Sequence, residues 1–377
     1  MEVDSDIKEY LSSLESQLPN DLAKLVSDCA VFFERRFWHQ LTETAFEFLT
    51  DPRSEQFRLS FYLNFISYWG KNMNKTKLVI FAVLAANQLQ DKNEVDDLFS
   101  KVLQIVNTPE SQDAYAFALL ENGNFKLLQN DLDSTMETMK QAKQIISSLN
   151  KVDPVIHASY YRLNADYYKV KANFGDYYRN SLLYLSCIKI EDLSQAQQFE
   201  RAHDLAVSAL LSDSIYNFGD LLSHPIIQTL KDSEQFWLYE LLLSFNNGDI
   251  SSLMNLRDRL QNHPLLLQKV DFLQKKMRLM ALVEIVFKKQ GSGDKNDQSI
   301  PFEVLASDIK VAVSDIEHLV MMALSLRLID GKIDEISKCV NFKWVQPRYL
   351  DKSQIKTMAV RLDYLNLRSL AMINEMN

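Results

Sequence analysis

The spacing of apolar residues changes within residues 299–347, and this change restricts the fold more than any other feature of the chain. The first part of the segment has the period of about 3.6 residues that helices show, and the later part alternates as strands do. The predicted elements, in chain order, are a strand at 299–301, helices at 302–309 and 314–327, and strands at 328–333 and 339–345. Two short helices followed by a two-stranded ribbon predict a winged helix.

Local features refine this prediction. Ser314 is placed to cap the second helix, because its hydroxyl can accept a hydrogen bond from a free backbone N–H. Alternation puts Val340, Phe342 and Trp344 on one side of the last strand. We expect the strand from Val340 to Val345 to be an exposed edge that can accept a strand of another protein.

Charge argues against the DNA-binding role that most winged helices have. DNA binding depends mainly on Lys and Arg side chains that neutralise phosphates. Residues 300–347 hold five cations and seven anions, which gives a net charge of −2. Asp315 and Glu317 stand in the first turn of the helix that would read the DNA. We therefore expect this module to bind protein and no nucleic acid.

Composition narrows the class of protein further. Gly and Pro number eight each, well below average usage, which favours long helices. The formal net charge of −9 disfavours nonspecific binding to nucleic acid or to an anionic membrane. Three widely separated cysteines indicate a reducing compartment. Because the N-terminus is acidic, we expect it to be neither a secretory signal nor an Arg-rich transit peptide. No apolar run is long enough to span a bilayer, so we expect no membrane association.

The first 289 residues read as helices joined by short breaks. The clearest hairpin is formed by residues 21–35 and 37–49, and Asn122-Gly123-Asn124 is one of the predicted breaks. Further helices are predicted at 54–69, 74–89, 92–106, 109–121, 131–149, 155–172, 195–213, 218–223, 225–231, 233–246, 249–260 and 264–289. Such hairpins in series predict an α-solenoid of the tetratricopeptide type, without a strict repeat of about 34 residues.

Aromatic residues are dense between Tyr160 and Tyr184, and Arg162 and Lys169 lie among them. Two interpretations are open. Rings and cations together can form a stacking surface for single-stranded nucleic acid. Alternatively, the rings fill the spaces between solenoid helices.

No pattern of residues indicates catalysis. The six histidines form neither an HxH nor an HExxH pair, and the glycine-containing loop after residue 289 has the wrong spacing for a phosphate loop. A nucleophile elbow and a dinucleotide fingerprint are also missing from the sequence. We therefore predict a non-enzyme with no catalytic, cofactor-binding or metal-binding residues. An enzyme would have to bring together distant carboxylates or histidines.

A last helix is predicted between Lys352 and Met376, with apolar residues at heptad spacing. The stripe residues predicted to bind partners are Ile355, Met358, Leu362, Leu365 and Met372. Because this helix follows a complete winged helix, we expect the stripe to be buried against other chains. The partner-binding residues predicted within the winged helix are Val340, Asn341, Phe342, Lys343, Trp344, Met322 and Leu326. For Met322 and Leu326, ordinary core packing is the alternative.

Helical hairpins that run into an acidic winged helix resemble the PCI module, which the proteasome lid, the signalosome and a translation initiation complex share. Short segments are also similar to a family of non-ATPase subunits of the 26S proteasome lid. These segments are residues 37–41 (FWHQL), 215–225 (IYNFGDLLSHP), 317–321 (EHLVM), 330–334 (DGKID) and 344–348 (WVQPR). The resemblance covers nearly the whole chain.

The resemblance implies a mainly α-helical chain in three parts. These are a solenoid at 1–172, a PCI domain at 173–347 with its winged helix from residue 290, and a C-terminal bundle helix at 348–377. It implies a non-catalytic scaffold subunit of the lid, found in cytoplasm and nucleus. The implied partners are other PCI subunits through the winged helix, the lid helical bundle through the last helix, and the ubiquitin-receptor and deubiquitinase region of the particle.

A second hypothesis is a PCI subunit of the signalosome, of translation initiation or of mRNA export, with RNA contact at the winged helix or the tyrosine-rich region. The two hypotheses differ in charge. An RNA-binding PCI protein should have a basic groove, and its affinity should fall steeply with salt.

Overall fold

The computed structural model describes residues 2–369, apart from residues 90, 150, 232, 234, 252–262, 291–298, 347–354, 357, 361 and 365. The chain divides into two compact units. The first comprises Met1–Ala172 with Arg179–Lys189, and the second comprises Asn173–Tyr178 with Ile190–Asn377. Among the described residues, no helix combines the length and the apolar character needed to cross a membrane.

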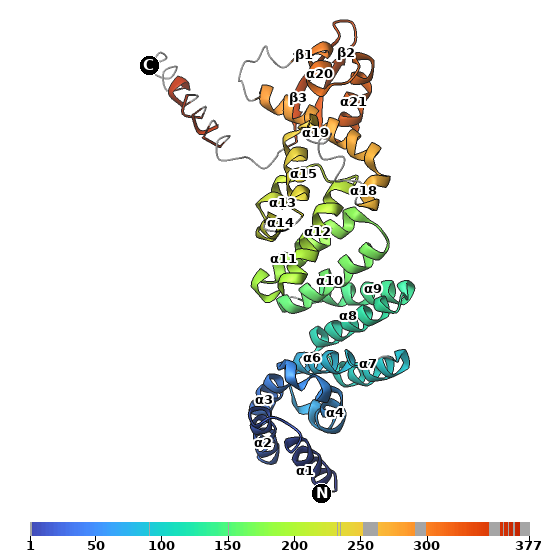
Figure 1. Cartoon of the computed structure of the whole chain (residues 1–377), viewed down its shortest axis with the longest axis vertical. Coiled ribbons are helices and arrows are strands. Elements are labelled where there is room, and N and C mark those ends of the chain that lie inside the picture. Colours follow the sequence, from blue (N-terminus) through green and yellow to red (C-terminus); the bar gives the residue numbers. More distant parts are fainter. Residues whose placement is uncertain are drawn as a thin grey trace. The chain divides into compact units, whose positions relative to one another are not determined.

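The first unit is a series of helices that pack on their neighbours in the chain (Figure 1). Its helices are α1 (Glu2–Glu15), α2 (Asn20–Glu34), α3 (Trp38–Thr50), η1 (Pro52–Phe57), α4 (Arg58–Phe61), η2 (Tyr62–Ile66), α5 (Ser67–Trp69), η3 (Gly70–Asn72), α6 (Lys75–Ala86), α7 (Lys92–Val106), α8 (Gln112–Leu128), α9 (Leu132–Ser148) and α10 (Pro154–Val170). Helix α11 (Phe174–Cys187) contributes residues to both units. The predicted series of helical hairpins is confirmed.

The break predicted at Asn122-Gly123-Asn124 is wrong, because α8 continues through it to Leu128. A side chain on Gly123 would place its Cβ 2.8 Å from Leu163 Cδ2 and 3.0 Å from Thr138 Oγ1. The glycine therefore permits close approach of α9 and α10 to α8, and it does not end the helix.

The single helix predicted at 54–69 is also wrong. A 3₁₀ segment, η1, leads into α4, and η2 is a π-helix that separates α4 from α5. Helix interiors seldom contain π-turns, and those that occur are frequent at functional sites. The sequence pattern of apolar residues does not distinguish these helix types over so few residues.

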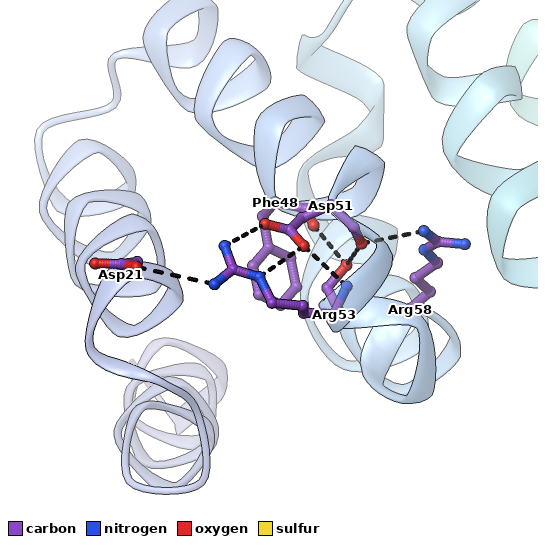
Figure 2. A network of polar contacts seen from close by, with 6 residues as sticks. Asp21, Phe48, Asp51, Arg53 and Arg58 are labelled. Carbon is purple, nitrogen blue, oxygen red and sulfur yellow. Dashed lines mark hydrogen bonds and ion pairs between the residues drawn. The ribbon is translucent and has the colours of Figure 1, made fainter.

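A network of polar contacts around Asp51 fixes the turn between α3 and η1 (Figure 2). The Asp51 carboxylate accepts the backbone N–H of Arg53 and, at Oδ2, Arg53 Nη2, both at 2.8 Å. These hydrogen bonds from Arg53 lower the pKa of Asp51. Arg58 Nη2 donates to the Asp51 carbonyl at 3.2 Å, and the buried Ser54 hydroxyl donates to the Phe48 carbonyl at 2.6 Å. The network sets the direction in which the chain enters α4.

The second unit consists of helices followed by a small sheet. Its elements are η4 (Ile190–Asp192), α12 (Gln195–Leu211), α13 (Gly219–Ser223), η5 (Pro225–Ile227), α14 (Gln228–Lys231), α15 (Phe236–Asn247), α18 (Pro264–Gln268), α19 (Val270–Gln290), β1 (Ser299–Pro301), α20 (Phe302–Ile309), α21 (Val313–Ser325), β2 (Ile329–Asp334) and β3 (Cys339–Val345). The helix predicted at 264–289 is interrupted at Lys269. The helix predicted at 249–260 lies mostly outside the described residues.

One buried cation holds the carboxyl end of α12. Lys276 of α19 is 1% exposed, and its Nζ donates to the carbonyls of Ala209, Leu210 and Ser212 at 2.8, 3.2 and 2.6 Å. The last carbonyls of a helix have no partner within the helix, so the lysine acts as a tertiary cap. Burial lowers the pKa of Lys276 to about 7, and the nearby carboxylate of Asp213 opposes this shift.

The winged helix predicted at 299–347 is confirmed. Strand order is β1-β3-β2, both pairings are antiparallel, and α19, α20 and α21 pack on the sheet and on one another. Residues of all these elements form one hydrophobic core, which includes Val286, Leu305, Val320 and Val340. The Ser314 cap is wrong, because α21 begins at Val313 and Ser314 Oγ donates to Asp315 Oδ1 at 3.3 Å.

A β-bulge interrupts the pairing of β2 with β3. Asp330 is opposite Trp344 and Gly331 is opposite Phe342, so Lys343 has no partner residue on β2. A Cβ on Gly331 would lie 2.4 Å from the backbone oxygen of Asn341. Only glycine therefore fits opposite the bulge without movement of the backbone.

Gly331→Ala is expected to destabilise the winged helix by about 2 kcal/mol, because the new methyl group meets a backbone atom that cannot rotate away. Thermal unfolding of the purified chain, followed by circular dichroism, measures the effect. Lys332→Ala, at the exposed neighbouring position, is the control and should change stability little. Equal stability of the two variants would show that the bulge relaxes easily.

Candidate partner-binding surfaces

The last strand of the winged helix is not the exposed edge that the sequence predicted. Asn341 of β3 pairs with Ser299 on one side and with Lys332 on the other, so β3 is the central strand. Beyond Asn341, residues Phe342, Trp344 and Val345 pair only with β2 among the described strands. The order could not be read from the sequence, because a three-residue strand distant in the chain supplies the second neighbour.

The buried and exposed side chains of β3 do not follow the predicted alternation along the whole strand. Val340 and Phe342 are 0% and 2% exposed and belong to the core, whereas Asn341 and Lys343 face solvent. Trp344 is 46% exposed, so its predicted place beside Val340 and Phe342 is wrong. The bulge explains the difference, because one extra residue turns every later side chain to the opposite face. Of the five predicted contact residues on β3, three are accessible.

Helix α21 carries a further exposed apolar area. Met322 packs partly against the core, while Leu326 is 39% exposed. Met321 and Val313, which the sequence analysis did not select, are 47% and 43% exposed. Their spacing from the core positions is the signal that could have identified them, since they lie away from the buried face.

The wing carries an exposed apolar side chain at its tip. Ile336 is 99% exposed in the turn between β2 and β3. The Asp334 carboxylate holds this turn by accepting the N–H groups of Ile336 and Ser337 at 3.1 and 3.2 Å, and hydrogen bonding from Ser337 lowers the pKa of Asp334. The sequence analysis missed Ile336, because an isolated isoleucine in a turn gives no periodic signal.

The C-terminal segment exposes its apolar residues. Ile355, Met358 and Leu362 are 52%, 48% and 63% exposed, and the other described positions between 355 and 369 are exposed as well. The predicted stripe residues Leu365 and Met372 lie outside the described residues. Within the part that the structure describes, the stripe is therefore not covered by the chain's own core.

The tyrosine-rich region is largely packed. Tyr167 is 3% exposed, and Tyr160 and Tyr168 pack against the core of the first unit. Arg162 is engaged, because its Nη2 lies 3.0 and 2.9 Å from the two carboxylate oxygens of the buried Glu121. These contacts favour the packing interpretation over a stacking surface for nucleic acid.

Helical hairpins that lead into a winged helix of this topology define a PCI protein. The family model described as PCI domain matches residues 252–344, and the model described as PSD13 N-terminal repeats matches residues 25–242.

Similarity to known proteins extends over nearly the whole chain. The probable 26S proteasome regulatory subunit rpn9 of Schizosaccharomyces pombe is 35% identical over 364 residues, 96% of this chain and 93% of the relative. The 26S proteasome regulatory subunit RPN9 of Saccharomyces cerevisiae is 33% identical over 95% of this chain and 93% of the relative. The 26S proteasome non-ATPase regulatory subunit 13 homolog A of Arabidopsis thaliana is 32% identical over 94% of this chain and 93% of the relative. The chain therefore belongs to the family of these regulatory subunits.

Similarity to PCI proteins of other complexes is partial. Subunit 7 of the COP9 signalosome complex of Dictyostelium discoideum is 31% identical over 150 residues, which are 38% of this chain and 52% of that relative. That match covers less than half of this chain, in contrast to the similarity to the 26S proteasome regulatory subunits.

Proposed function

We propose that this chain is a non-catalytic scaffold subunit of the 26S proteasome regulatory-particle lid. The observation that carries the proposal is similarity over more than nine-tenths of the chain to proteins named as 26S proteasome regulatory subunits. The names of related subunits from Arabidopsis thaliana and Dictyostelium discoideum include the term non-ATPase. The chain's task is to hold other subunits in place for ubiquitin-dependent protein degradation.

Binding to neighbouring subunits takes place, in this proposal, at exposed apolar side chains of the second unit. In the winged helix, Met321, Leu326 and Trp344 contact the PCI module of a neighbouring subunit, because each is between about two-fifths and half exposed. Removing apolar surface from water contributes about 25 cal/mol per Å² in favour of association, before the entropic cost of binding is subtracted. The C-terminal stripe, including Ile355 and Leu362, enters a bundle with helices of other lid subunits.

Further partners are the ubiquitin-receptor and deubiquitinase region of the particle, reached through the helices of the first unit. The negative charge of the winged helix supports a protein partner over RNA.

Cytoplasm and nucleus are the proposed locations, and imaging of a fluorescently tagged chain in cells tests them.

Deletion of residues 352–377 is expected to abolish entry into the lid, because it removes the apolar stripe that other chains cover. The measurement is affinity purification of tagged full-length and truncated chains, followed by mass spectrometry of the proteins that accompany them. Thermal unfolding should show that the truncated chain is folded, since the described part of the stripe contributes nothing to the core.

Lid subunits that accompany the truncated chain in undiminished amount would exclude the bundle role. A full-length chain that brings no lid subunit would contradict the scaffold proposal itself. A full-length chain that instead binds RNA with a steep salt dependence would favour the alternative of an RNA-associated PCI complex.

A further inference from the structure

The first unit contains an apolar groove to which the proposed winged-helix and bundle contacts assign no role. Its volume is about 760 Å³, which is in the range of binding pockets. One wall is formed by Leu59, Leu63 and Ser67 of the segment from α4 to α5, and the other by Leu98 and Ile105 of α7.

The π-helix η2 contributes to the first wall, and its opposite face is buried. Phe61, Phe65 and Trp69 make one buried face, with ring centroids 5.1 and 5.9 Å apart along the series. Leu63, on the groove side, remains 48% exposed. Tyr62 lines the groove from a buried position, and burial raises its pKa to about 12. The segment is therefore anchored by buried aromatic rings on one face and exposes Leu63 to solvent on the other.

The rim of the groove is charged on one wall only. Glu94, Asp97 and Lys101 line it from α7, and all three are exposed. On the opposite wall, the segment 58–69 has a single charged residue, Arg58, which donates to the Asp51 carbonyl. The two carboxylates lie one helical turn apart near the start of α7 and make that end of the groove negative.

We propose that this groove binds an amphipathic helix of a partner protein. Apolar side chains at positions i, i+3 or i+4, and i+7 of that helix enter the groove, in the way such helices bind elsewhere. Lysine or arginine on its flank lies beside Glu94 and Asp97, which sets the orientation of the helix. The inference adds a contact surface to the proposed scaffold role, but it depends only on the geometry of the first unit.

The test is fluorescence anisotropy with the purified full-length chain and two labelled synthetic peptides. Both peptides are helical with the same leucine face, and their flanks carry lysine in one and glutamate in the other. We expect the lysine peptide to bind at least about tenfold more tightly, a difference of about 1.4 kcal/mol. Glu94→Gln combined with Asp97→Asn should make the two affinities nearly equal.

Leu63→Glu should reduce binding of the lysine peptide by about tenfold or more, because it places a charge on the apolar wall. The matched control is Leu128→Glu, which changes a leucine of α8 that is 80% exposed and does not line the groove. Thermal unfolding of both variants shows whether they are folded.

Three outcomes overturn the inference: no binding of either peptide, equal binding by the Leu63→Glu and Leu128→Glu variants, or occupation of the groove by a fatty acid that neither peptide displaces. The last would identify a site for a small apolar ligand. None of these outcomes changes the result of the co-purification experiment, so failure here is distinct from failure of the scaffold proposal.

Discussion

Val340→Asp is expected to unfold the winged helix. Val340 is fully buried on the central strand, and it pairs with Ile300 of β1 and Ile333 of β2. A carboxylate at this position would be buried in the hydrophobic core that includes Leu305 and Val320. The expected loss exceeds about 4 kcal/mol, because burial of an unpaired charge is among the most destabilising changes.

Hydrogen exchange measured by mass spectrometry, peptide by peptide, reports this effect locally. Peptides from 299–345 of Val340→Asp should lose protection, while peptides from the first unit should keep theirs. Asn341→Asp introduces the same charge one residue further along the strand at an exposed position, so it should leave protection unchanged. Protection of Val340→Asp at the level of the parent chain would mean that β3 is not part of a packed core.

Lys276→Met is expected to lower the free energy of unfolding by about 2–4 kcal/mol, because carbonyls at the end of α12 lose their donor and stay buried. The rings of Tyr216 and Phe218, each 5.3 Å from Nζ, lose their cation as well. Lys275→Met is the matched control, since Lys275 is the exposed neighbour on the same helix. Chemical denaturation of the three proteins at one pH gives the comparison.

The effect of Lys276 also depends on pH. The unfolded chain holds this proton up to about the ordinary pKa of 10.5, whereas the folded chain releases it near 7. Between these values the unfolded state binds more protons, so the contribution of Lys276 to stability rises with pH. The difference between the parent chain and Lys276→Met should therefore widen from pH 7 to pH 9. A difference that narrows over this range would contradict the lowered pKa.

Much of the winged helix could be predicted because its signals are local. The strand predicted at 299–301 and the helix predicted at 302–309 have the observed bounds, and the apolar period identified the second helix and the last two strands. The same rule failed for Trp344, since alternation holds only while the pairing is regular, and the bulge beside Gly331 interrupts it. The predicted partner-binding residues of the winged helix were therefore only partly accessible. Leu326, Lys343 and Trp344 are exposed, whereas Val340 and Phe342 lie in the core.

The amino-acid sequence by itself determined the helical class, the winged helix and the family resemblance, because periodicity, charge and short segments are properties of neighbouring residues. Only the tertiary structure decided that β3 is central, that Gly123 lies inside a helix, and that Lys276 caps α12 from 64 to 67 residues away. Each of these depends on which distant backbone approaches a given residue. Such contacts are set by packing of the whole unit, and no local pattern records them.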